Sequence, residues 1–489
     1  MKQLAYQRSN RTLGFPAQFG LFLWSTGCLQ QTIEALHRCG LSVAYSSVLS
    51  NIAKLADHCM QMAINVGSGA HVFCYDNVQL STSIYVEQRG SSGPAKVTSG
   101  TFGILYKVRN GNPAHMKLSP ILERFRSSKG LDFMHDLCPS VQQLESVDFQ
   151  MKVVIVRVLI TYCTQFESYA ADPVLQHWPR RPMPAGYKTE QFPIRATTIE
   201  EATVHGNLLF HDDVYINQLK RTPEDLCEYA IPSFNDQLTN SRIRSGQVTR
   251  AHDKNAWSRR EVFQLGFGLF HLCLNLVWAL LHVHLGNLGQ TGSLAFFFAL
   301  LEKTRLGGEH PDYHTLLSAL TQILDGILLN AWRCETGHHD LGKFAATEPS
   351  AEDLISIAGN ILLNHATPMS IPDSANDEPS DEEIQDELGY CDSSDSECEE
   401  ELTEGIAKTS SSIRDPDRDR AHQNLRLLTH DLLYVAELVC AISDGDIGHV
   451  EDILPTLAKM FRGAGGNNYC TEILHFILNL KHVWTPEFA

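Results

Sequence analysis

A run of acidic residues divides the part of this chain that can fold. Between Pro372 and Glu404 the sequence has 15 Asp and Glu residues and no Lys or Arg. The surrounding stretch is rich in Ser and Pro, and Tyr390 is its one aromatic residue. Such a segment cannot bury enough apolar surface to offset the entropy that folding costs. We therefore predict a disordered acidic linker over residues 368–419, which separates a large folded part from a helical segment over residues 420–489.

The same run accounts for most of the net charge. The chain has 39 Lys and Arg against 57 Asp and Glu, and its formal charge is -18. Without the 15 acids of the linker, 42 acids face 39 bases, which leaves -3 for the rest. A strongly negative protein is a poor ligand for nucleic acid, because phosphate contacts rest on Lys and Arg. A nearly neutral folded part leaves DNA open as a partner, and the acidic linker is a candidate surface for protein partners.

Targeting signals and membrane segments are not evident in the sequence. The first 15 residues contain no apolar region of the kind that a secretory signal needs. The 13 Cys are scattered without regular spacing, which suits a reducing compartment. The apolar stretch Val262–Leu285 is interrupted by polar residues such as Gln264, His271 and Asn275, which are costly in lipid. We predict a buried helix there and an intracellular protein, nuclear or cytoplasmic, without membrane contact; the oligomeric state is not predicted.

Local patterns predict helices around a small sheet. Apolar residues recur at helical spacing over residues 20–66. The run His71–Tyr75 then reads as a strand that ends at the polar pair Asp76-Asn77, and Ser83–Val86 and Thr101–Val108 are further strand candidates. Residues 151–160 fit either a helix or a strand, and the length of the stretch favours a helix. Residues 173–193 read as a Pro-rich connection and residues 256–333 as helices.

Two aspartates are the leading candidates for chemistry. Asp76 ends an apolar strand and Asp236 ends another extended segment. Carboxylates brought close without a cation repel each other, and a divalent metal removes that conflict. Two Mg²⁺ ions about 4 Å apart activate a water and stabilise the leaving oxygen of a phosphodiester. The alternative is that Asp76 and Asp236 are turn and cap residues, because Asp-Asn and Asn-Asp pairs are common in turns.

A set of short motifs spread over residues 70–480 carries a resemblance to a known family. The motifs are Tyr75-Asp76-Asn77, Asn235–Thr239 with Arg242, Leu269-Phe270-His271, Pro311-Asp312-Tyr313, and Ser443–Gly448 with Asn468-Tyr469 and Glu472. In this combination the chain resembles an uncharacterised family of large fungal proteins, abundant in mushroom genomes and thought to derive from transposons.

The resemblance implies an RNase H-like transposase fold, whose site is a trio of acids that binds divalent metal. The first Asp lies on the first strand, the second on the fourth, and a third acid, usually Glu, on a later helix that often follows a helical insertion. Asp76 and Asp236 match the first two places, and Glu472 is the preferred third. The implied cofactor is Mg²⁺ or Mn²⁺, and Asn77, Gln237 and His271 would flank the site.

The predicted fold class is accordingly α/β or α+β, with an RNase H-like mixed sheet, a large helical insertion and a helix-rich chain overall. The strands near residues 83 and 101 would be the second and third of the sheet. The predicted organisation is an N-terminal helical segment (1–66), the sheet core (67–255), the helical insertion (256–367), the acidic linker (368–419) and a C-terminal helical segment (420–489).

The third acid and the histidines leave alternatives open. Glu302 and Asp446 are the other candidates for the third acid, and a truncated chain would lack the true ligand beyond Ala489. A histidine on an apolar helix, as His271 is, more often belongs to a core than to a site. Cys334, His338 and His339 suggest a structural zinc, but the sequence offers no partner pair at the usual ligand spacing.

Two functions follow from the sequence. The leading hypothesis is a transposon-derived protein that binds DNA and cuts or joins its strands with Mg²⁺, or a degenerate relic of such an enzyme. The alternative is a catalytically inactive, domesticated scaffold that binds other proteins through its helices and acidic linker. The separation of Asp76 and Asp236 in space distinguishes them, because two carboxylates can share a metal only when they lie close together.

Overall fold

The computed structural model describes residues 13–82, 96–368 and 420–489, and it consists of two compact units. Residues 369–419 of the predicted acidic linker and the predicted strand Ser83–Val86 lie outside the described residues. Each unit is assembled from separate stretches of chain. Unit 1 comprises Met1–Val147, Pro179–Ala279 and Leu438–Ala489, and unit 2 comprises Asp148–Trp178 and Leu280–Glu437.

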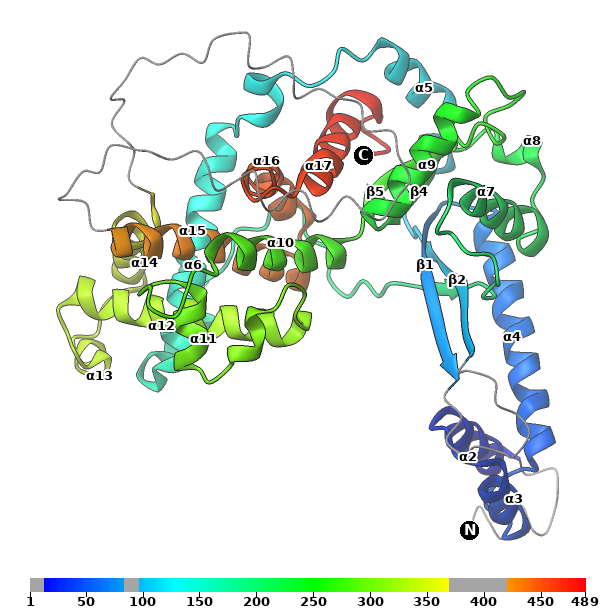
Figure 1. Ribbon diagram of the computed structural model, residues 1–489, viewed down its shortest axis with the longest axis horizontal. Coiled ribbons are helices and arrows are strands. Elements are labelled where there is room, and N and C mark those ends of the chain that lie inside the picture. Colours follow the sequence, from blue (N-terminus) through cyan, green and yellow to red (C-terminus); the bar gives the residue numbers. More distant parts are fainter. Residues whose placement is uncertain (1–12, 83–95, 369–419) are drawn as a thin grey trace. The chain divides into compact units, whose positions relative to one another are not determined.

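Unit 1 contains a five-stranded mixed sheet in the order β3-β2-β1-β4-β5 (Figure 1). Its central strand β1 is antiparallel to β2 and parallel to β4, and β4 is parallel to β5. This sheet in a helix-rich chain confirms the predicted α+β class. The strands are β1 (His71–Thr82), β2 (Lys96–Lys107), β3 (Gln191–Pro193), β4 (Ile231–Asn235) and β5 (Phe263–Phe267).

One face of the sheet packs into the main core of unit 1. Phe73, Tyr75 and Leu105 point into that core, where they meet Phe210 and Tyr215. Alternation along a strand sends Val72, Cys74 and Asp76 to the other face, which is only partly buried. The core is covered by α4 (Tyr45–Gly67), α7 (Val204–Asp212) and the short helical segment η5 (Asp213–Gln218). The two faces of the sheet therefore have different roles.

Two strands were missed in the sequence, and another was predicted to end too early: β1 does not stop at Asp76-Asn77 but continues to Thr82, because Asp76 and the residues after it pair with β2. Residues 191–193 form the edge strand β3 inside the stretch predicted as a Pro-rich connection, and a strand edge tolerates the missing N–H of Pro193. Phe263–Phe267 form β5 within the stretch predicted as one helix, Val262–Leu285. All five residues of β5 are buried, and periodicity cannot separate so short a buried strand from a helix. The strand predicted as third, near residue 101, is the second strand β2.

The remaining helices of unit 1 lie before the sheet, between its strands and after it in the sequence. Helices α2 and α3 pack against α4 around a small cluster of Ile33, Val43 and Val48. At the other end of the chain, α17 contacts β5 and α9. The helices are α2 (Gly14–Ser25), α3 (Gln30–Arg38), α5 (Leu118–Ser127), α8 (Pro223–Leu226), α9 (Gln237–Thr249), α16 (Ile447–Gly463) and α17 (Asn467–Leu478).

In the described residues of unit 2, all regular secondary structure is helical. Buried Trp332 donates a hydrogen bond from its indole nitrogen to the carbonyl oxygen of Ile155, 3.1 Å away, which ties two of its helices together. Residues 151–160 lie in α6, so the helix predicted there is confirmed. The helices are α11 (Leu294–Leu300), α12 (Tyr313–Thr336), α13 (Leu341–Ala345) and α14 (Ala351–Ile361), with parts of α6 (Val141–Tyr162), α10 (Leu269–His284) and α15 (Arg420–Asp444).

The described residues contain neither a membrane-spanning helix nor a disulfide. Within those ranges every helix, α10 included, falls short of the length or apolar character that a membrane crossing needs. The cysteines of the same ranges form no disulfide with one another.

Candidate functional site

Asp76 lies within β1, and Asp236 directly follows β4, the parallel neighbour of β1. The register pairs Phe73 of β1 with Ser233 of β4. Each aspartate comes three residues later along the chain, and both line one cavity of unit 1. Asp76 lies in the middle of β1, which continues to Thr82, whereas Asp236 follows the last residue of β4. The fold thus brings two aspartates that are 160 positions apart in the sequence to the same cavity.

Asp236 is also a helix cap, as the alternative interpretation of the sequence predicted. It directly follows β4, and its Oδ1 accepts a hydrogen bond of 2.7 Å from the backbone N–H of Thr239 in the first turn of α9. A cap of this kind fixes the carboxylate relative to the helix and satisfies an otherwise unpaired N–H. The capping role therefore fixes Asp236 at the C-terminal end of β4, and it is compatible with a place in a functional site.

Glu201 is a third carboxylate near this pair that the sequence did not reveal. Its side chain is 1% exposed, and Oε2 accepts a hydrogen bond of 3.1 Å from the hydroxyl of Thr239. Burial, and then the negative charges of Asp236 and Asp76, raise the pKa of Glu201 to about 8. The backbone before Glu201 packs closely against position 206, where only a glycine fits: a Cβ there would lie 1.9 Å from the carbonyl oxygen of Glu200.

His271, a residue that the resemblance placed beside the site, lies next to Asp76. Its Nε2 lies 3.7 Å from Oδ2 of Asp76, and the ring is partly exposed rather than part of the core. Interaction with Asp76 raises the pKa of His271, against the opposing effect of burial. The same contact lowers the pKa of Asp76. Asp76 is therefore held as a carboxylate beside a histidine that readily keeps its proton.

Asn77 and Gln237 have backbone roles beside the two aspartates. The N–H of Asn77 donates a hydrogen bond of 2.7 Å to Oδ1 of Asp76, and the Asn77 side chain is exposed. Gln237 is the first residue of α9 and is partly buried. Its backbone lies next to the hydroxyl of Tyr469, whose pKa is raised mainly by burial. Both residues shape the edge of the site.

Glu472, the predicted third acid, is engaged in a buried polar network. Its side chain is 3% exposed, and Oε1 accepts hydrogen bonds from Asn240 at 2.8 Å and from Arg244 at 3.1 Å. Its other oxygen forms an ion pair with Arg244. Asn240 also donates to the carbonyl oxygen of Gly266 in β5. Glu472 thus joins α17 to α9 and β5, and it positions the helix that Asp236 caps.

The other acids considered for the third place lie in different surroundings. Glu302 is an exposed residue of unit 2 with a φ of 56°. Asp446 is buried in unit 1, where it accepts hydrogen bonds from the backbone N–H groups of Arg180, Arg181 and Gly448. These bonds tie the start of α16 to the chain around Arg180. Asp446 therefore has a structural function at the N-terminus of that helix.

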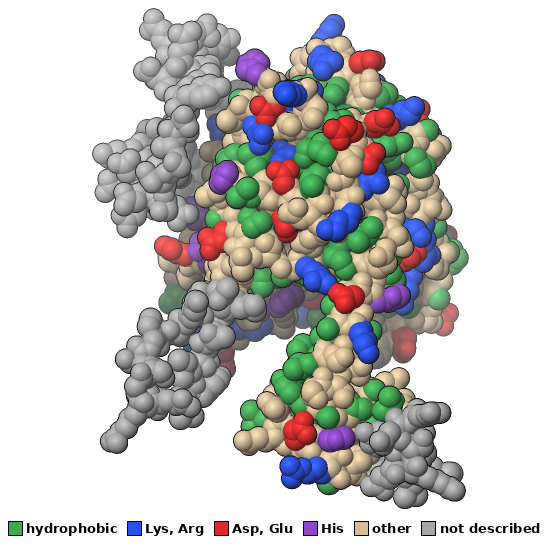
Figure 2. All heavy atoms as spheres, turned by 90° about the vertical axis from the view of Figure 1, so that its right-hand side faces the viewer, with side chains coloured by type: hydrophobic (Ala, Val, Ile, Leu, Met, Phe, Trp, Pro, Cys, Tyr) green, Lys and Arg blue, Asp and Glu red, His purple; other side chains and the backbone are tan. Residues whose placement is uncertain are grey.

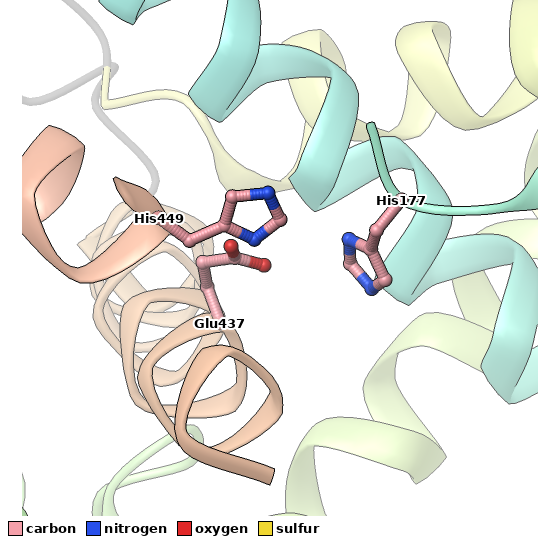
Figure 3. A group of neighbouring side chains, drawn as sticks. All are labelled: His177, Glu437 and His449. Atoms are coloured by element: carbon pink, nitrogen blue, oxygen red, sulfur yellow. The ribbon is translucent and has the colours of Figure 1, made fainter. Parts of the chain in front are cut away.

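Among the described residues, Cys334, His338 and His339 do not form a group with all their ligand atoms within 4.8 Å of one another. Cys334 is exposed, and His339 lies 3.1 Å from the guanidinium of Arg333. In unit 2, ligand atoms of His177 and Glu437 lie within 4.8 Å of one another (Figure 3). His449, drawn in the same figure, belongs to unit 1, where its Nε2 lies 3.7 Å from Asp446.

A cavity of about 540 Å³ in unit 1 opens beside the aspartates. Asp76, Asp236 and His271 contribute to its lining, together with aromatic and aliphatic side chains of the second face of the sheet. Glu451 of α16 lines it as well and forms an ion pair with Arg181. Burial raises the pKa of Glu451. The cavity is therefore bordered by carboxylates in an otherwise apolar wall.

The donors at this edge fit a hard divalent cation. Asp76, Asp236 and Glu201 have carboxyl oxygens, the donors that Mg²⁺ prefers. The pKa of Glu201 is raised first by burial and then by the charges of Asp236 and Asp76, and a cation would offset those charges. In the described ranges, these three do not form a group with all ligand atoms within 4.8 Å of one another. Mg²⁺ keeps several of its waters in proteins, so it does not require so close a group.

The raised pKa of Glu201 predicts how the free energy of unfolding depends on pH. A carboxyl whose pKa is about 8 in the folded protein and near 4.5 when unfolded binds more protons when folded between these values. The contribution of Glu201 to stability is therefore largest below pH 4.5 and falls as the pH rises to 8, by at most about 1.4 kcal/mol per pH unit. Glu201→Gln should remove this decline, so urea unfolding in EDTA should show it more stable than the wild type at pH 8. Glu200→Gln, at the exposed neighbour, is the control, and equal pH profiles for all three proteins would contradict the assignment.

Comparison with known proteins adds one finding. A model described as a family of unknown function (DUF6589) matches residues 126–489, more than half of the chain. The matched range includes Glu201, Asp236 and Glu472, and it begins after Asp76. Neither the curated proteins nor the solved structures give a match.

Proposed function

The chain belongs to the DUF6589 family, whose function is unknown, and we propose from the chain's own site that unit 1 is an RNase H-like, metal-dependent enzyme that cuts or joins DNA strands. The cofactor would be Mg²⁺ or Mn²⁺. A transposon origin, suggested by the resemblance of the sequence motifs, agrees with this activity.

The observation that Asp76 and Asp236 line the same cavity carries the proposal. The resemblance implied a first aspartate on the first strand and a second on the fourth, and these residues lie in β1 and directly after β4. Glu201 adds a buried carboxylate next to them, and Glu451 lines the same cavity. Several carboxylates at the edge of a sheet beside an open cavity are suited to binding cations and a phosphodiester together.

Each residue of the site has a distinct chemical part. Asp76, Asp236 and Glu201 would hold the cations, which when bound supply an activated water and stabilise the leaving oxygen. Asp76 is ready as a carboxylate because contact with His271 lowers its pKa. His271 can hold a proton at Nε2 and move it to a nearby oxygen. The network of Asn240, Glu472 and Arg244 keeps α9, and with it Asp236, in position.

The charge distribution allows DNA binding through a limited number of contacts. Figure 2 shows Lys and Arg interspersed with Asp and Glu on the face that it draws. Arg242, partly buried near Glu201, is a cation close to the carboxylates. Binding should therefore weaken only moderately with added salt, because the salt dependence of DNA binding scales with the number of phosphates that Lys and Arg contact.

The test is strand cleavage by the full-length protein. Supercoiled plasmid should be nicked or linearised in low salt with Mg²⁺ or Mn²⁺ and stay intact in EDTA. Cleavage that persists in EDTA would contradict the metal-dependent mechanism. A folded protein that neither binds DNA at low salt nor cuts it with either metal would overturn the proposal in favour of a scaffold without catalytic activity.

A further inference from the structure

We infer that the cavity of unit 1 binds an unpaired nucleobase next to the phosphodiester that lies at Asp76 and Asp236. This inference rests on the proposed function and specifies its substrate: DNA with a single-stranded or unstacked nucleotide at the reacting position. Three observations carry it, namely the size of the cavity, its aromatic walls and the place of its carboxylates.

The cavity has the dimensions of a small-molecule site. Its volume of about 540 Å³ falls in the range of about 300–1,000 Å³ that is usual for ligand pockets. Its floor is the second face of the sheet, where Val72, Phe102, Ile104 and Tyr106 are only partly buried. Apolar strand residues normally bury themselves against a second layer, and here they face open space. The fold thus leaves an apolar hollow with room for a flat group.

Aromatic rings form the walls of this hollow. Phe234 of β4 lies over the neighbouring strand because position 266 is a glycine: a Cβ there would lie 2.4 Å from the Phe234 ring. Phe476 of α17 packs edge-on against Phe267, with 4.9 Å between the ring centroids. Phe270, which is 53% exposed, lines the same cavity beside His271. Rings of this kind offer stacking surfaces to a base, whichever base it is.

The lining of the cavity is acidic rather than basic. Asp76, Asp236, His271 and Glu451 line the cavity, whereas Lys and Arg are absent among its lining residues in the described part of unit 1. A phosphate can approach these carboxylates only through bound cations, while the apolar wall takes an uncharged flat body. A nucleotide combines both properties. Inside a duplex the faces of a base are covered by its neighbours, so the bound nucleotide must be single-stranded or unstacked.

Equilibrium binding of a fluorescent oligonucleotide to the full chain tests the inference. The probe is single-stranded DNA with one 2-aminopurine, in Ca²⁺, so that binding is measured without relying on cleavage. Stacking on the cavity rings should quench the fluorescence. Replacing that nucleotide by an abasic one should weaken binding by about tenfold or more, since stacking contributes this much per base. This arm changes only the DNA and is independent of protein folding.

A variant that fills the cavity provides the protein arm. Ile104→Trp places a large ring into the open space, and it should weaken binding by about tenfold and abolish the quench. Leu55→Trp introduces the same residue on α4, where Leu55 is 50% exposed, and should change neither. Near-identical circular dichroism spectra of the two variants would exclude unfolding as the cause of the loss.

The outcomes separate this inference from the proposed function. A quenched base that depends on the cavity, without any cleavage in Mg²⁺, would support the inference and overturn the enzymatic proposal. Cleavage in Mg²⁺ that is indifferent to Ile104→Trp and to the abasic nucleotide would overturn the inference alone. Release of the probe by tetramethylammonium but not by adenosine would assign the cavity to an organic cation and would also overturn it.

Discussion

Asp76→Asn is expected to lower the rate of Mg²⁺-dependent strand cleavage by about a hundredfold or more. The substitution keeps the shape of the side chain but removes the negative charge that would hold a cation together with Asp236. Stabilisation of the reacting oxygens by bound metal contributes several kcal/mol, and each 1.4 kcal/mol changes a rate about tenfold. Initial rates of plasmid nicking at saturating Mg²⁺ measure the loss directly.

The matched control for this experiment is Asp57→Asn. Asp57 lies on α4, its side chain is 71% exposed, and it forms a surface ion pair with Arg195. Such pairs contribute between 0 and about 1 kcal/mol, so the variant should cut DNA at the rate of the wild type. Activity of Asp76→Asn close to that of Asp57→Asn would rule out a role for Asp76 in holding the metal.

Breaking the Arg244–Glu472 pair should strongly lower the free energy of unfolding. Glu472→Leu leaves the guanidinium of Arg244 without its carboxylate, and it removes the acceptor of the Asn240 bond. Loss of one partner of a buried ion pair costs about 3–5 kcal/mol, because the remaining charge is uncompensated. The free energy of unfolding from urea titration should fall by that amount.

The double variant Arg244→Met with Glu472→Leu is the control. It removes both charges, so most of the stability lost in the single variant should return. The same protein separates a structural from a metal-binding role for Glu472. If Glu472 acts only through α9, the double variant should bind Mg²⁺ nearly as well as the wild type. A folded double variant that no longer binds Mg²⁺ would instead make Glu472 a metal ligand.

Sequence reasoning succeeded where the pattern was local. The apolar run that ends at Asp76 lies in β1, and the long stretch around residues 151–160 is a helix. It failed for β3, which is a short strand at an edge of the sheet, and for β5, which is short and buried. The three residues of β3 are too few for a periodic pattern, and β5 is buried on every side. Their strand character comes from hydrogen bonds to β2 and β4, which are distant in the sequence.

The candidate site shows the same division. The types of residue at Asp76 and Asp236 singled them out, because a carboxylate at the end of an apolar segment is a local feature. Glu201 could not be distinguished from Glu200 in the sequence, yet one is buried and the other exposed. Glu472 was identified as an acid of interest, but its partners Asn240 and Arg244 are more than 200 positions away.

By itself, the sequence determined the helix-rich α+β character of the chain and two candidate aspartates. It also predicted an acidic segment whose high charge and scarcity of apolar residues disfavour folding. Only the tertiary structure decided that Asp76 and Asp236 line one cavity, that Glu201 is buried near them and that Glu472 is bonded to α9. The physical reason is that these relations depend on the register of two parallel strands and on burial. Both are set by contacts between segments far apart in the chain, and no local pattern of residues encodes them.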